Sequence, residues 1–428
     1  DTIYQYSTTL ATAQLDLSTG SVFDYTPTSN AQVKLTNPAA SGTASGATLL
    51  LTGAEGTGVA STFSTTLYTG TGAAKTISNG LDLANDGGLV WTKKRNGTIG
   101  HRLVDTERGV QKSLRTEGTD AEVVNANGLT AFNSDGYSIG SSGSHNAISD
   151  TYVSWSFKKQ TKFFDVVTWT GDGTTLRSIS HALGGIPGIM VIKKINGAAH
   201  WPVYHRSLTS SPQDRILRLS GSGAEESAST VWGNTAPTDS VFSVGNHAWS
   251  NASGGTYVAY LFAHDTASDG LIQCGSLTDG GAGINLGWEP QFVLIKRTDT
   301  DSANPSSGSR ASRGNWIIAD TKRGMPVDAQ VYGLSPNLAD AEIQDDFYIR
   351  PTSTGFTYDS LSYDGNGDFI YMAIRAENLP TITYDPNLQW SGGTAPTAPA
   401  MGETDLITFN TTDGGTTYKS ALAIDGAK

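Results

Sequence analysis

The sequence has one cysteine and no long apolar run, and each shortage excludes a class of protein. A single thiol, Cys274, cannot form an intrachain disulfide, so a disulfide framework is excluded. We expect this residue to be a small buried one. No apolar stretch approaches the ~20 residues of a membrane-spanning helix, so we expect no membrane insertion. The N-terminal segment shows no charged start followed by an apolar core, so we expect no signal peptide.

Positive charge is also scarce. The chain carries 28 Lys and Arg against 40 Asp and Glu, for a net charge of −12. The densest basic cluster is Lys93, Lys94 and Arg95, which we interpret as the end of a strand. Because an acidic protein is repelled by the phosphate backbone, we expect no nucleic-acid binding.

The residues that are abundant favour β-structure. Glycine accounts for 50 of 428 residues, and Ser, Thr, Asn and Asp separate the apolar runs. These residues form turns, and the runs between them have strand length. Long segments of helix-forming residues are missing. The composition therefore predicts an all-β protein with many short strands.

Five motifs recur in the same order three times, with a spacing of about 100 residues. They are a polar Gly/Thr segment (from Leu67, Val167 and Cys274), an apolar strand with a basic end (Gly88, Gly188 and Gln291), a short strand into a turn (Arg102, Trp201 and Trp316), a Phe/Tyr segment (Asp135, Val241 and Thr354) and a closing strand (Tyr152, Tyr257 and Ile370).

A unit of this length is large enough to bury its own core. We therefore predict three tandem globular β domains, at residues 61–160, 161–266 and 267–379. The closing strand of the first alternates between a face with Tyr152 and Ser154 and a face with Trp155 and Phe157. A β-sandwich, jelly-roll-like, accommodates such strands.

The two ends do not follow the repeat. Residues 1–60 and 380–428 each contain a few strand-like runs, and neither end is long enough for a good core. We therefore hypothesise that the ends pack together into one further β domain, with the three repeats inserted between them.

These end segments carry a resemblance to a known group of proteins. Leu-Asp-Leu-Ser-Thr-Gly-Ser-Val-Phe near the N-terminus resembles a segment of bacteriophage tail fibre and tail appendage proteins. Gln-Trp-Ser-Gly-Gly-Thr-Ala-Pro and Thr-Asp-Gly-Gly-Thr-Thr-Tyr near the C-terminus resemble the closing segment of the same proteins, with Tyr418 in place of the usual Trp. In that family the two pieces follow each other directly.

The repeats are similar to a domain of unknown function in phage structural proteins. The motifs that carry this similarity are Gly-Gly-Leu-Val-Trp-Thr-Lys-Lys-Arg, Leu-Val-Asp-Thr-Glu-Arg-Gly and Tyr-Val-Ala-Tyr-Leu-Phe-Ala. The resemblance covers nearly the whole chain and carries no catalytic residues.

The resemblance implies a structural protein of the virion tail that displays β domains toward the host surface. Its expected partners are other tail proteins, further copies of itself in a homotrimer, and a host cell-surface glycan. Two alternatives stay open: a capsid decoration or capsid fibre protein, and a glycan-cleaving tailspike.

Searches for catalytic chemistry find no clear constellation. The Gly/Ser stretches have no helix behind them for a nucleophile elbow, and the seven histidines have no zinc-site spacing. No spacing singles out a carboxylate pair for glycoside cleavage. We therefore expect no enzyme activity and no cofactor.

Three weaker candidate sites remain. Asp364, Asn366 and Asp368 alternate as calcium-loop ligands do, although the bidentate Glu that ends such a loop is missing. A tight hairpin turn is the favoured interpretation.

Asp105, His205 and Asp320 recur at one position before a turn, where an aspartate can bond to the backbone of the turn. Ligand binding is the alternative, and His205 shows that such a site would not be shared by all repeats.

Trp201, Trp232 and Trp249 lie near expected loops of the second repeat, where aromatic rings can stack on sugars. Packing beneath a loop is the favoured interpretation, and sugar binding is the alternative.

Overall fold

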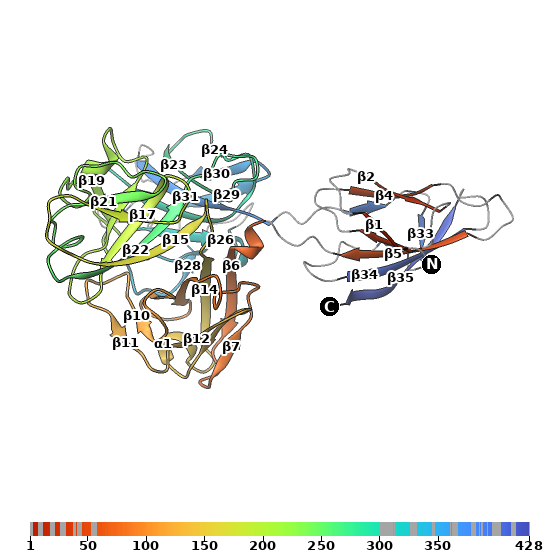
Figure 1. Cartoon of the computed structure of the whole chain (residues 1–428), viewed down its shortest axis with the longest axis horizontal. Coiled ribbons are helices and arrows are strands. Elements are labelled where there is room, and N and C mark those ends of the chain that lie inside the picture. The colour runs from red at the N-terminus through yellow and green to blue at the C-terminus, as the bar shows by residue number, and fades with distance from the viewer. Residues whose placement is uncertain are drawn as a thin grey trace. The chain divides into compact units, whose positions relative to one another are not determined.

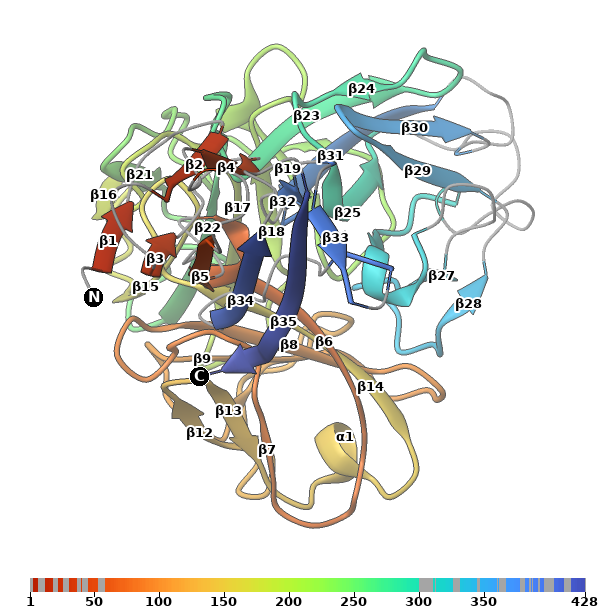
Figure 2. The same ribbon diagram turned by 90° about the vertical axis from the view of Figure 1, so that its right-hand side faces the viewer.

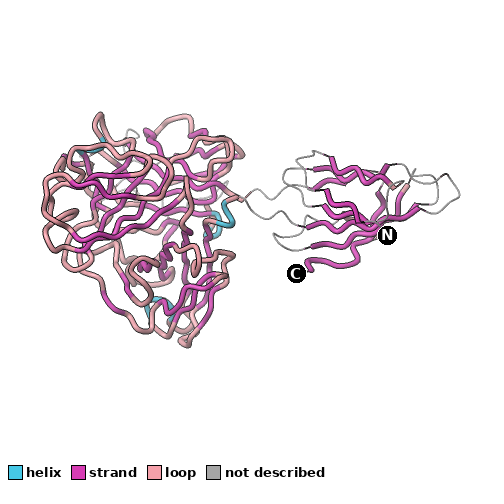
Figure 3. The backbone as a smooth tube through the Cα atoms, viewed as in Figure 1, coloured by secondary structure: helices cyan, strands magenta, loops and turns pink. Residues whose placement is uncertain are grey.

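The computed structural model describes residues 58–299 without interruption. Beyond these it describes residues 3–6, 12–17, 22–25, 31–36, 40, 45–52, 311, 313–325, 332–344, 347–359, 361, 367–377, 382–384, 386, 388–391, 393–395, 404–411 and 417–427. Nearly all regular structure in these residues is β-strand (Figure 3), which confirms the predicted all-β fold class. The helical elements are the short α1 (Gly143–Asn146), η1 (Val59–Ser61), η2 (Pro212–Asp214) and η3 (Thr321–Arg323). None of the helices described is long and apolar enough to span a bilayer.

The chain divides into two compact units (Figure 1). One, here called the terminal unit, combines Asp1–Thr57 with Glu377–Lys428. The other, the repeat unit, is Gly58–Ala376 and contains all three repeats. For the numbering of repeats 1, 2 and 3 we keep the ranges 61–160, 161–266 and 267–379.

The terminal unit joins the two ends of the chain in one sheet. Its strands are β1 (Ile3–Tyr6), β2 (Thr12–Asp16), β3 (Val22–Tyr25), β4 (Ala31–Thr36), β5 (Ser45–Thr52), β32 (Ile382–Tyr384), β33 (Leu388–Trp390), β34 (Thr404–Thr411) and β35 (Tyr418–Ala427). They form a sheet of order β1-β3-β5-β34-β35-β33 and a sheet of order β2-β4-β32. The antiparallel pairing of β5 with β34 extends from Ser45↔Thr411 to Thr52↔Thr404. The two ends therefore contact each other as hypothesised.

Successive N-terminal strands alternate between these two sheets, so neighbours within a sheet run parallel. The apolar positions alternate to match. Leu49 of β5 and Ile407 of β34 are buried in the same core as Val33 of β4. This core lies between the sheets and draws on both ends of the chain.

Each repeat contains an antiparallel sheet with the same order of four strands, and in repeat 2 this sheet continues into two further strands. In repeat 1 the strands are β6 (Phe63–Thr69), β14 (Thr151–Lys158), β8 (Gly88–Lys94) and β9 (Arg102–Asp105). In repeat 2 they are β15 (Phe164–Thr170), β22 (Thr256–Ala263), β17 (Pro187–Lys194) and β18 (Pro202–His205). In repeat 3 they are β23 (Ile272–Thr278), β31 (Asp368–Arg375), β25 (Pro290–Arg297) and β26 (Ile317–Asp320).

A smaller sheet covers one face of each large sheet and makes each repeat a two-layer sandwich. The smaller sheets contain β7 (Lys75–Ile77), β12 (Leu129–Asn133) and β13 (Gly136–Ile139); β16 (Arg177–Ser180) and β21 (Val241–Val244); and β24 (Ile284–Asn285), β29 (Tyr348–Thr352) and β30 (Gly355–Asp359). In repeat 1 the stacked rings of Tyr68 and Tyr152 belong to the buried cluster that contains Ile77 of β7 and Tyr137 of β13.

Each repeat also has a short hairpin beside its last large-sheet strand. The hairpin strands are β10 (Lys112–Ser113) and β11 (Val123–Val124), β19 (Arg215–Arg218) and β20 (Glu226–Ser227), and β27 (Tyr332–Gly333) and β28 (Ile343–Gln344). This hairpin extends beyond its own sandwich, and its loop reaches the next repeat.

Repeats 1 and 3 each bury a core of their own, and a further core, which includes the interior of repeat 2, joins all three repeats. The second face of each large sheet is also apolar and packs against the other repeats. Phe157 of repeat 1 lies 5.3 Å, between ring centroids, from Phe262 of repeat 2, and Phe63 lies 5.4 Å from Phe292 of repeat 3. Each sandwich alone would leave this face in water. In Figure 2 the repeats occupy three sectors, with β14 of repeat 1 at the bottom, β21 of repeat 2 at the upper left and β29 of repeat 3 at the right.

Backbone hydrogen bonds close the three repeats into a ring. A glutamate in each hairpin donates its backbone N–H to a carbonyl at the end of the apolar strand of the next repeat, and repeat 3 bonds in this way to repeat 1. The bonds are Glu122 N to Ile195 O (2.9 Å), Glu225 N to Thr298 O (2.8 Å) and Glu342 N to Arg95 O (2.7 Å). Every junction of the ring therefore uses corresponding residues.

A buried ring nitrogen makes a second bond at each junction. Each ring lies just before the short strand of one repeat. It donates to a backbone carbonyl at the end of the first hairpin strand of the preceding repeat, or within two residues after it. The bonds are Trp201 Nε1 to Arg115 O (3.2 Å), Trp316 Nε1 to Arg218 O (2.8 Å) and His101 Nε2 to Ser335 O (3.0 Å). Because a carbonyl only accepts, His101 carries its proton on Nε2.

Buried lysines explain the basic ends of the apolar strands. Lys193 donates to the carbonyls of Thr119 and Ala199, both at 2.7 Å, and Thr119 belongs to the hairpin loop of the preceding repeat. Lys296 donates in the same way to Gly223 O at 2.8 Å. Burial lowers the pKa of Lys193 to about 8 and that of Lys296 to about 7. The amino groups therefore satisfy loop carbonyls at the junctions.

Two junctions contain a buried acid–arginine pair with an aromatic donor from the next repeat. Asp105 accepts from Arg108 Nε at 2.6 Å and from the hydroxyl of Tyr260 at 2.8 Å. At the corresponding positions Asp320 accepts from Arg323 Nε at 2.6 Å and from Trp155 Nε1 at 2.9 Å. Because a buried charge needs several partners, these contacts fix how the repeats dock.

The third junction, between repeats 2 and 3, has replaced all three components. His205, Leu208 and Met372 stand where the other junctions have Asp, Arg and an aromatic donor. The imidazole of His205 is buried, accepts from Ser207 N at Nδ1, and donates from Nε2 to the carbonyl of Tyr371 at 3.1 Å. A neutral histidine thus bridges these two repeats without a buried ion pair.

Substitution of Tyr260 by Phe tests the polar junction between repeats 1 and 2. The change removes one hydrogen bond to Asp105 and one from Arg108, whose Nη2 lies 3.2 Å from the hydroxyl, while it keeps the ring. We expect a loss of about 1–3 kcal/mol in the free energy of unfolding, measured by denaturant titration. The matched control is Tyr371→Phe, whose hydroxyl has no hydrogen bond within the described residues. Equal stability of the two variants would contradict the assigned role.

Buried histidines predict a loss of stability in acid. Burial holds the pKa of His205 and of His145 at about 3 and that of His101 well below 6.5. Between these values and 6.5 the unfolded chain binds protons that the folded chain does not, so stability falls as the pH decreases through this window. We expect about 1.4 kcal/mol per histidine for each pH unit below 6.5.

The measurement is the free energy of unfolding between pH 7 and pH 4.5. His205→Gln should lower the free energy of unfolding at pH 7. It should also make the slope of this free energy against pH smaller by the contribution of one histidine. Parallel curves for the variant and the original protein would show that His205 is not the group that titrates.

Candidate functional site

Two of the three tryptophans considered as candidates for sugar binding are core residues. The Trp201 side chain is fully buried between repeats 1 and 2, and its indole nitrogen also lies 3.1 Å from Gly118 O. Trp232 is 1% exposed and donates to Arg215 O at 2.9 Å. Neither ring has a face available for stacking, so both agree with the packing interpretation and not with sugar binding. Their indole nitrogens find carbonyl partners in the interior, which allows complete burial.

Trp249 is half-buried and lies in a cluster of cationic and imidazole groups. The guanidinium carbon of Arg218 is 5.0 Å from its ring centroid, and the rings of His247 and His200 are at 4.6 and 5.1 Å. Burial and the charge of Arg218 lower the pKa of both histidines. Trp249 is therefore the one of the three whose surroundings match a binding surface.

Beside this cluster is a pocket of about 340 Å³. It is lined by His200, Arg218, Gly221, Gly223, Ala224 and Glu226. Arg218 is already engaged, because its Nε lies 2.6 Å from Glu226 Oε1 and its Nη2 donates to Oε2 of the same carboxylate at 2.7 Å. The guanidinium is thus held by Glu226 on its edge and by Trp249 on its face.

The proposed calcium loop cannot be assembled from the described residues. Asp364 and Asn366 lie outside them, and Asp368 is the first residue of β31, where its Oδ1 accepts from Thr278 Oγ1 at 2.8 Å. Within the part of the chain that the structure describes, no group of three His, Cys, Asp or Glu residues is placed to hold a metal ion.

The turn interpretation of Asp105 and Asp320 is confirmed. Asp105 Oδ1 accepts from Arg108 N at 2.9 Å, and Asp320 Oδ1 accepts from Arg323 N at 3.0 Å. The other carboxylate oxygen of each makes the inter-repeat contacts described above, which the sequence alone did not reveal. Cys274 is buried as expected, and burial raises the pKa of its thiol.

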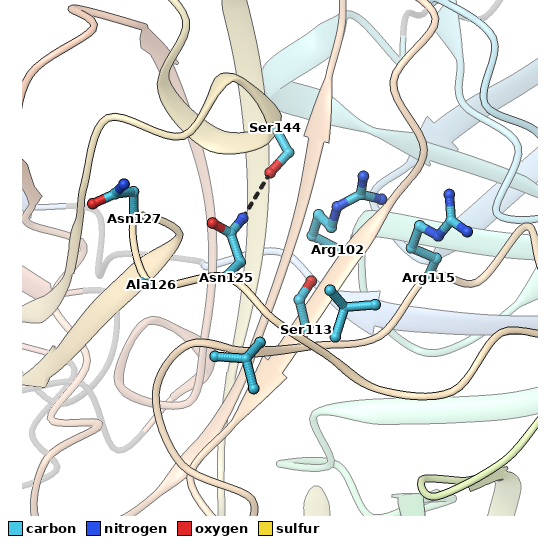
Figure 4. Close-up of a pocket in the computed structure, with 9 residues that line it drawn as sticks. Arg102, Ser113, Arg115, Asn125, Ala126, Asn127 and Ser144 are labelled. Atoms are coloured by element: carbon cyan, nitrogen blue, oxygen red, sulfur yellow. Dashed lines mark hydrogen bonds between the residues drawn. The ribbon is translucent and has the colours of Figure 1, made fainter.

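A second pocket, of about 380 Å³, lies in repeat 1 and was not anticipated from the sequence (Figure 4). It is lined by Arg102 of β9, Ser113 and Arg115 at β10, Val123 and Val124 of β11, Asn125, Ala126 and Asn127 after β11, and Ser144 of α1. No carboxylate is among these lining residues. The residues come from four separate segments, so no short motif marks the pocket.

Hydrogen bonds hold one wall of the pocket of repeat 1 in place. Asn125 Nδ2 donates to Ser142 Oγ at 2.9 Å and to Ser144 Oγ at 3.2 Å, which ties the segment after β11 to the single helical turn α1. The backbone N–H of Asn125 also donates to Gln111 O at 2.7 Å. The Asn125 wall is therefore fixed before any ligand arrives.

The two pockets occupy corresponding places in their repeats. Arg115 in the pocket of repeat 1 corresponds to Arg218 in the pocket of repeat 2, since each lies two residues after a paired hairpin residue. On the opposite hairpin strand, Val123 corresponds to Glu226. The repeat architecture thus creates a hollow beside the hairpin, and the side chains around it differ between repeats. These differences determine which hollow has free polar groups.

Comparison with known proteins places the repeat unit in a family. No curated protein matches the chain. A solved structure titled "Crystal Structure of the STIV MCP" aligns with 78% of this chain and 92% of that chain at 9% identity, and its TM-score of 0.16 is too low to carry an argument. The family described as "Domain of unknown function (DUF7483)" matches residues 59–378, nearly the same span as the repeat unit. The chain therefore belongs to this family, whose single domain contains all three repeats.

Proposed function

We propose that the chain is a structural virion protein of a bacteriophage, a tail fibre or tail-tip component that attaches to glycans on the host surface. In this proposal it is not an enzyme and needs no cofactor. Its partners are other tail proteins and the host surface, and its location is the virion tail.

The observation that carries the proposal is the pairing of the two end segments. The segments that resemble tail appendage proteins lie at opposite ends of the chain, and β5 pairs with β34 along eight residues of each. Such a terminal unit is what the resemblance implies, since the two pieces are adjacent in those proteins. The repeat unit is then an insertion carried by a tail-type module.

The repeat unit suits a display role. Its three sandwiches are joined by a common core, so the hollows beside the hairpins belong to a single compact unit. Weak contacts from several copies on one particle add up when their geometry allows simultaneous binding. A compact unit with a common core favours that geometry because its binding surfaces are packed together.

Self-association into a homotrimer is part of the proposal. Within the repeat unit the three repeats of one chain already cover one another, so further copies are not needed to bury these faces. Trimerisation would therefore use other surfaces. Light scattering at micromolar concentration should give the mass of three chains, and the mass of one chain would contradict the trimer.

Immunogold labelling of phage particles tests the location. We expect an antibody against this chain to place gold at the tail end in electron micrographs, because the end segments attach the protein to the tail. An antibody against a known head protein of the same phage serves as the control for background.

Other labelling patterns would overturn the assignment in different ways. Gold scattered over the head would identify a capsid decoration or capsid fibre protein, and absence of gold from all particles would remove the protein from the virion. Loss of host polysaccharide on incubation with the purified chain would show a glycan-cleaving tailspike.

A further inference from the structure

The pocket of repeat 1 has two guanidinium groups in its wall although the protein is acidic. The net charge of the chain is −12, and Arg102 and Arg115 lie on one side of this pocket with Asn125 and Asn127 on the other (Figure 4). We propose that the pocket binds a carboxylate-bearing sugar residue of a surface polysaccharide. This inference rests on the proposed function and specifies the class of its ligand.

Arg102 is held in place with part of its guanidinium unused. Its Nη1 donates to the backbone carbonyls of Gly100 and His101 at 3.2 and 2.9 Å, whereas its Nε and Nη2 have no hydrogen-bond partner among the described residues. A guanidinium fixed at one nitrogen presents the others in a planar fork that matches a carboxylate. Arg102 is therefore already oriented for an anionic group.

The charge of Arg102 is only partly balanced by the protein. The nearest carboxylate oxygen, Glu117 Oε1, is 3.9 Å from its Nη1, beyond hydrogen-bond length. Burial lowers the pKa of Arg102, and burial raises the pKa of Glu117, so each charge is poorly solvated where it lies. An anionic ligand would supply the close partner that Arg102 lacks.

Arg115 can turn toward a ligand at small cost. It forms an ion pair with Asp120, and the two side chains are 41% and 55% exposed. Ion pairs this exposed contribute about 0–1 kcal/mol, because water competes for both groups. A carboxylate in the pocket can therefore recruit Arg115 as a second cation without breaking a buried interaction.

Ser113 supplies an independent indication of a polar ligand. It lines the pocket, its side chain is 4% exposed, and its hydroxyl is buried without a hydrogen-bond partner in the described residues. An unsatisfied buried hydroxyl costs about 1–3 kcal/mol, so such groups are uncommon. A ligand hydroxyl would satisfy it.

The remaining wall fits a sugar better than a bare ion. Asn125 donates through Nδ2 to the two serines, which leaves its amide oxygen as an acceptor for ligand hydroxyls, and the exposed Asn127 adds a second amide. Val123 and Val124 are exposed and offer an apolar surface to the C–H groups of a ring. Oriented polar groups beside an apolar surface, in a volume above ~300 Å³, are typical of small-molecule sites.

The corresponding pocket of repeat 2 is a built-in comparison. There Arg218 is bound by Glu226 and stacked on Trp249, and Pro202 stands in place of Arg102. That pocket therefore lacks the free guanidinium pair. The assignment is specific to repeat 1.

The test uses the full chain and isothermal titration calorimetry. The probes are fragments of polygalacturonate, hyaluronan, alginate and polysialic acid, with dextran fragments of equal length as the neutral control and sulfated dextran as the control for charge alone. We expect at least one carboxylated probe to bind with one site per chain, and dextran not to bind.

Variants assign the binding to the pocket. Arg102→Gln should lower the affinity for the carboxylated probe by about tenfold or more, because a hydrogen bond to a charged group is lost. Arg115→Lys keeps the positive charge but loses the planar guanidinium. It should therefore lower the affinity for the probe less than Arg115→Gln does. The matched control, Arg215→Gln on repeat 2, should leave affinity unchanged. Thermal unfolding of each variant verifies its fold. Because the Arg115 side chain is exposed, we expect its variants to keep the stability of the original protein.

Several results would overturn the inference. These are no binding by any carboxylated probe, equal binding of dextran or sulfated dextran, and affinity that survives the double substitution of Arg102 and Arg115 by Gln. Gold at the virion tail together with any of these would reject the ligand class and keep the proposed function. A bound carboxylated probe on a protein absent from virions would reject the virion role and keep the pocket.

Discussion

Each four-stranded sheet of the repeat unit has two apolar faces, and the rest of that unit depends on covering both. In repeat 1, Tyr152 packs toward the small sheet of its own sandwich, whereas Trp155 and Phe157 of the same strand pack toward the other repeats. The small sheet of a sandwich covers only the first of these two faces. Three copies in one chain supply the second to one another, so the repeat is a structural unit that is complete only in the set of three.

The polar groups at the junctions determine how the repeats fit together, since apolar packing alone is not directional. Two junctions use a buried acid–arginine pair and an aromatic donor, and the third uses His205, Leu208 and Met372 at the same positions. The three replacements occur together because each removes a partner that the others need: an aspartate without its arginine would leave an unpaired buried charge. The family match to residues 59–378 agrees with this unit of three.

Much of the fold followed from the sequence, because strands and turns are local features. The repeated motifs identified corresponding strands, and the short runs at each end indicated that the ends needed each other. The shared core did not follow, because alternation in a strand such as β14 does not tell whether the second apolar face meets a neighbour or a sheet of its own repeat. The partner of the buried Trp201 was missed, because the carbonyl that accepts from its ring belongs to Arg115 of another repeat. The pocket of repeat 1 combines Arg102, Asn125 and Ser144 from three segments, which no spacing pattern connects.

Hydrogen exchange of the full chain after Phe157→Ala tests the shared core most directly. This ring contacts Phe262 of repeat 2 and Phe292 of repeat 3, and its removal from a packed core costs about 3–5 kcal/mol. If the three repeats unfold as one unit, the slowest amides of β22 and β31 should exchange faster by the same factor as those of β14. Faster exchange confined to repeat 1 would show that the repeats are independent domains and would contradict this account.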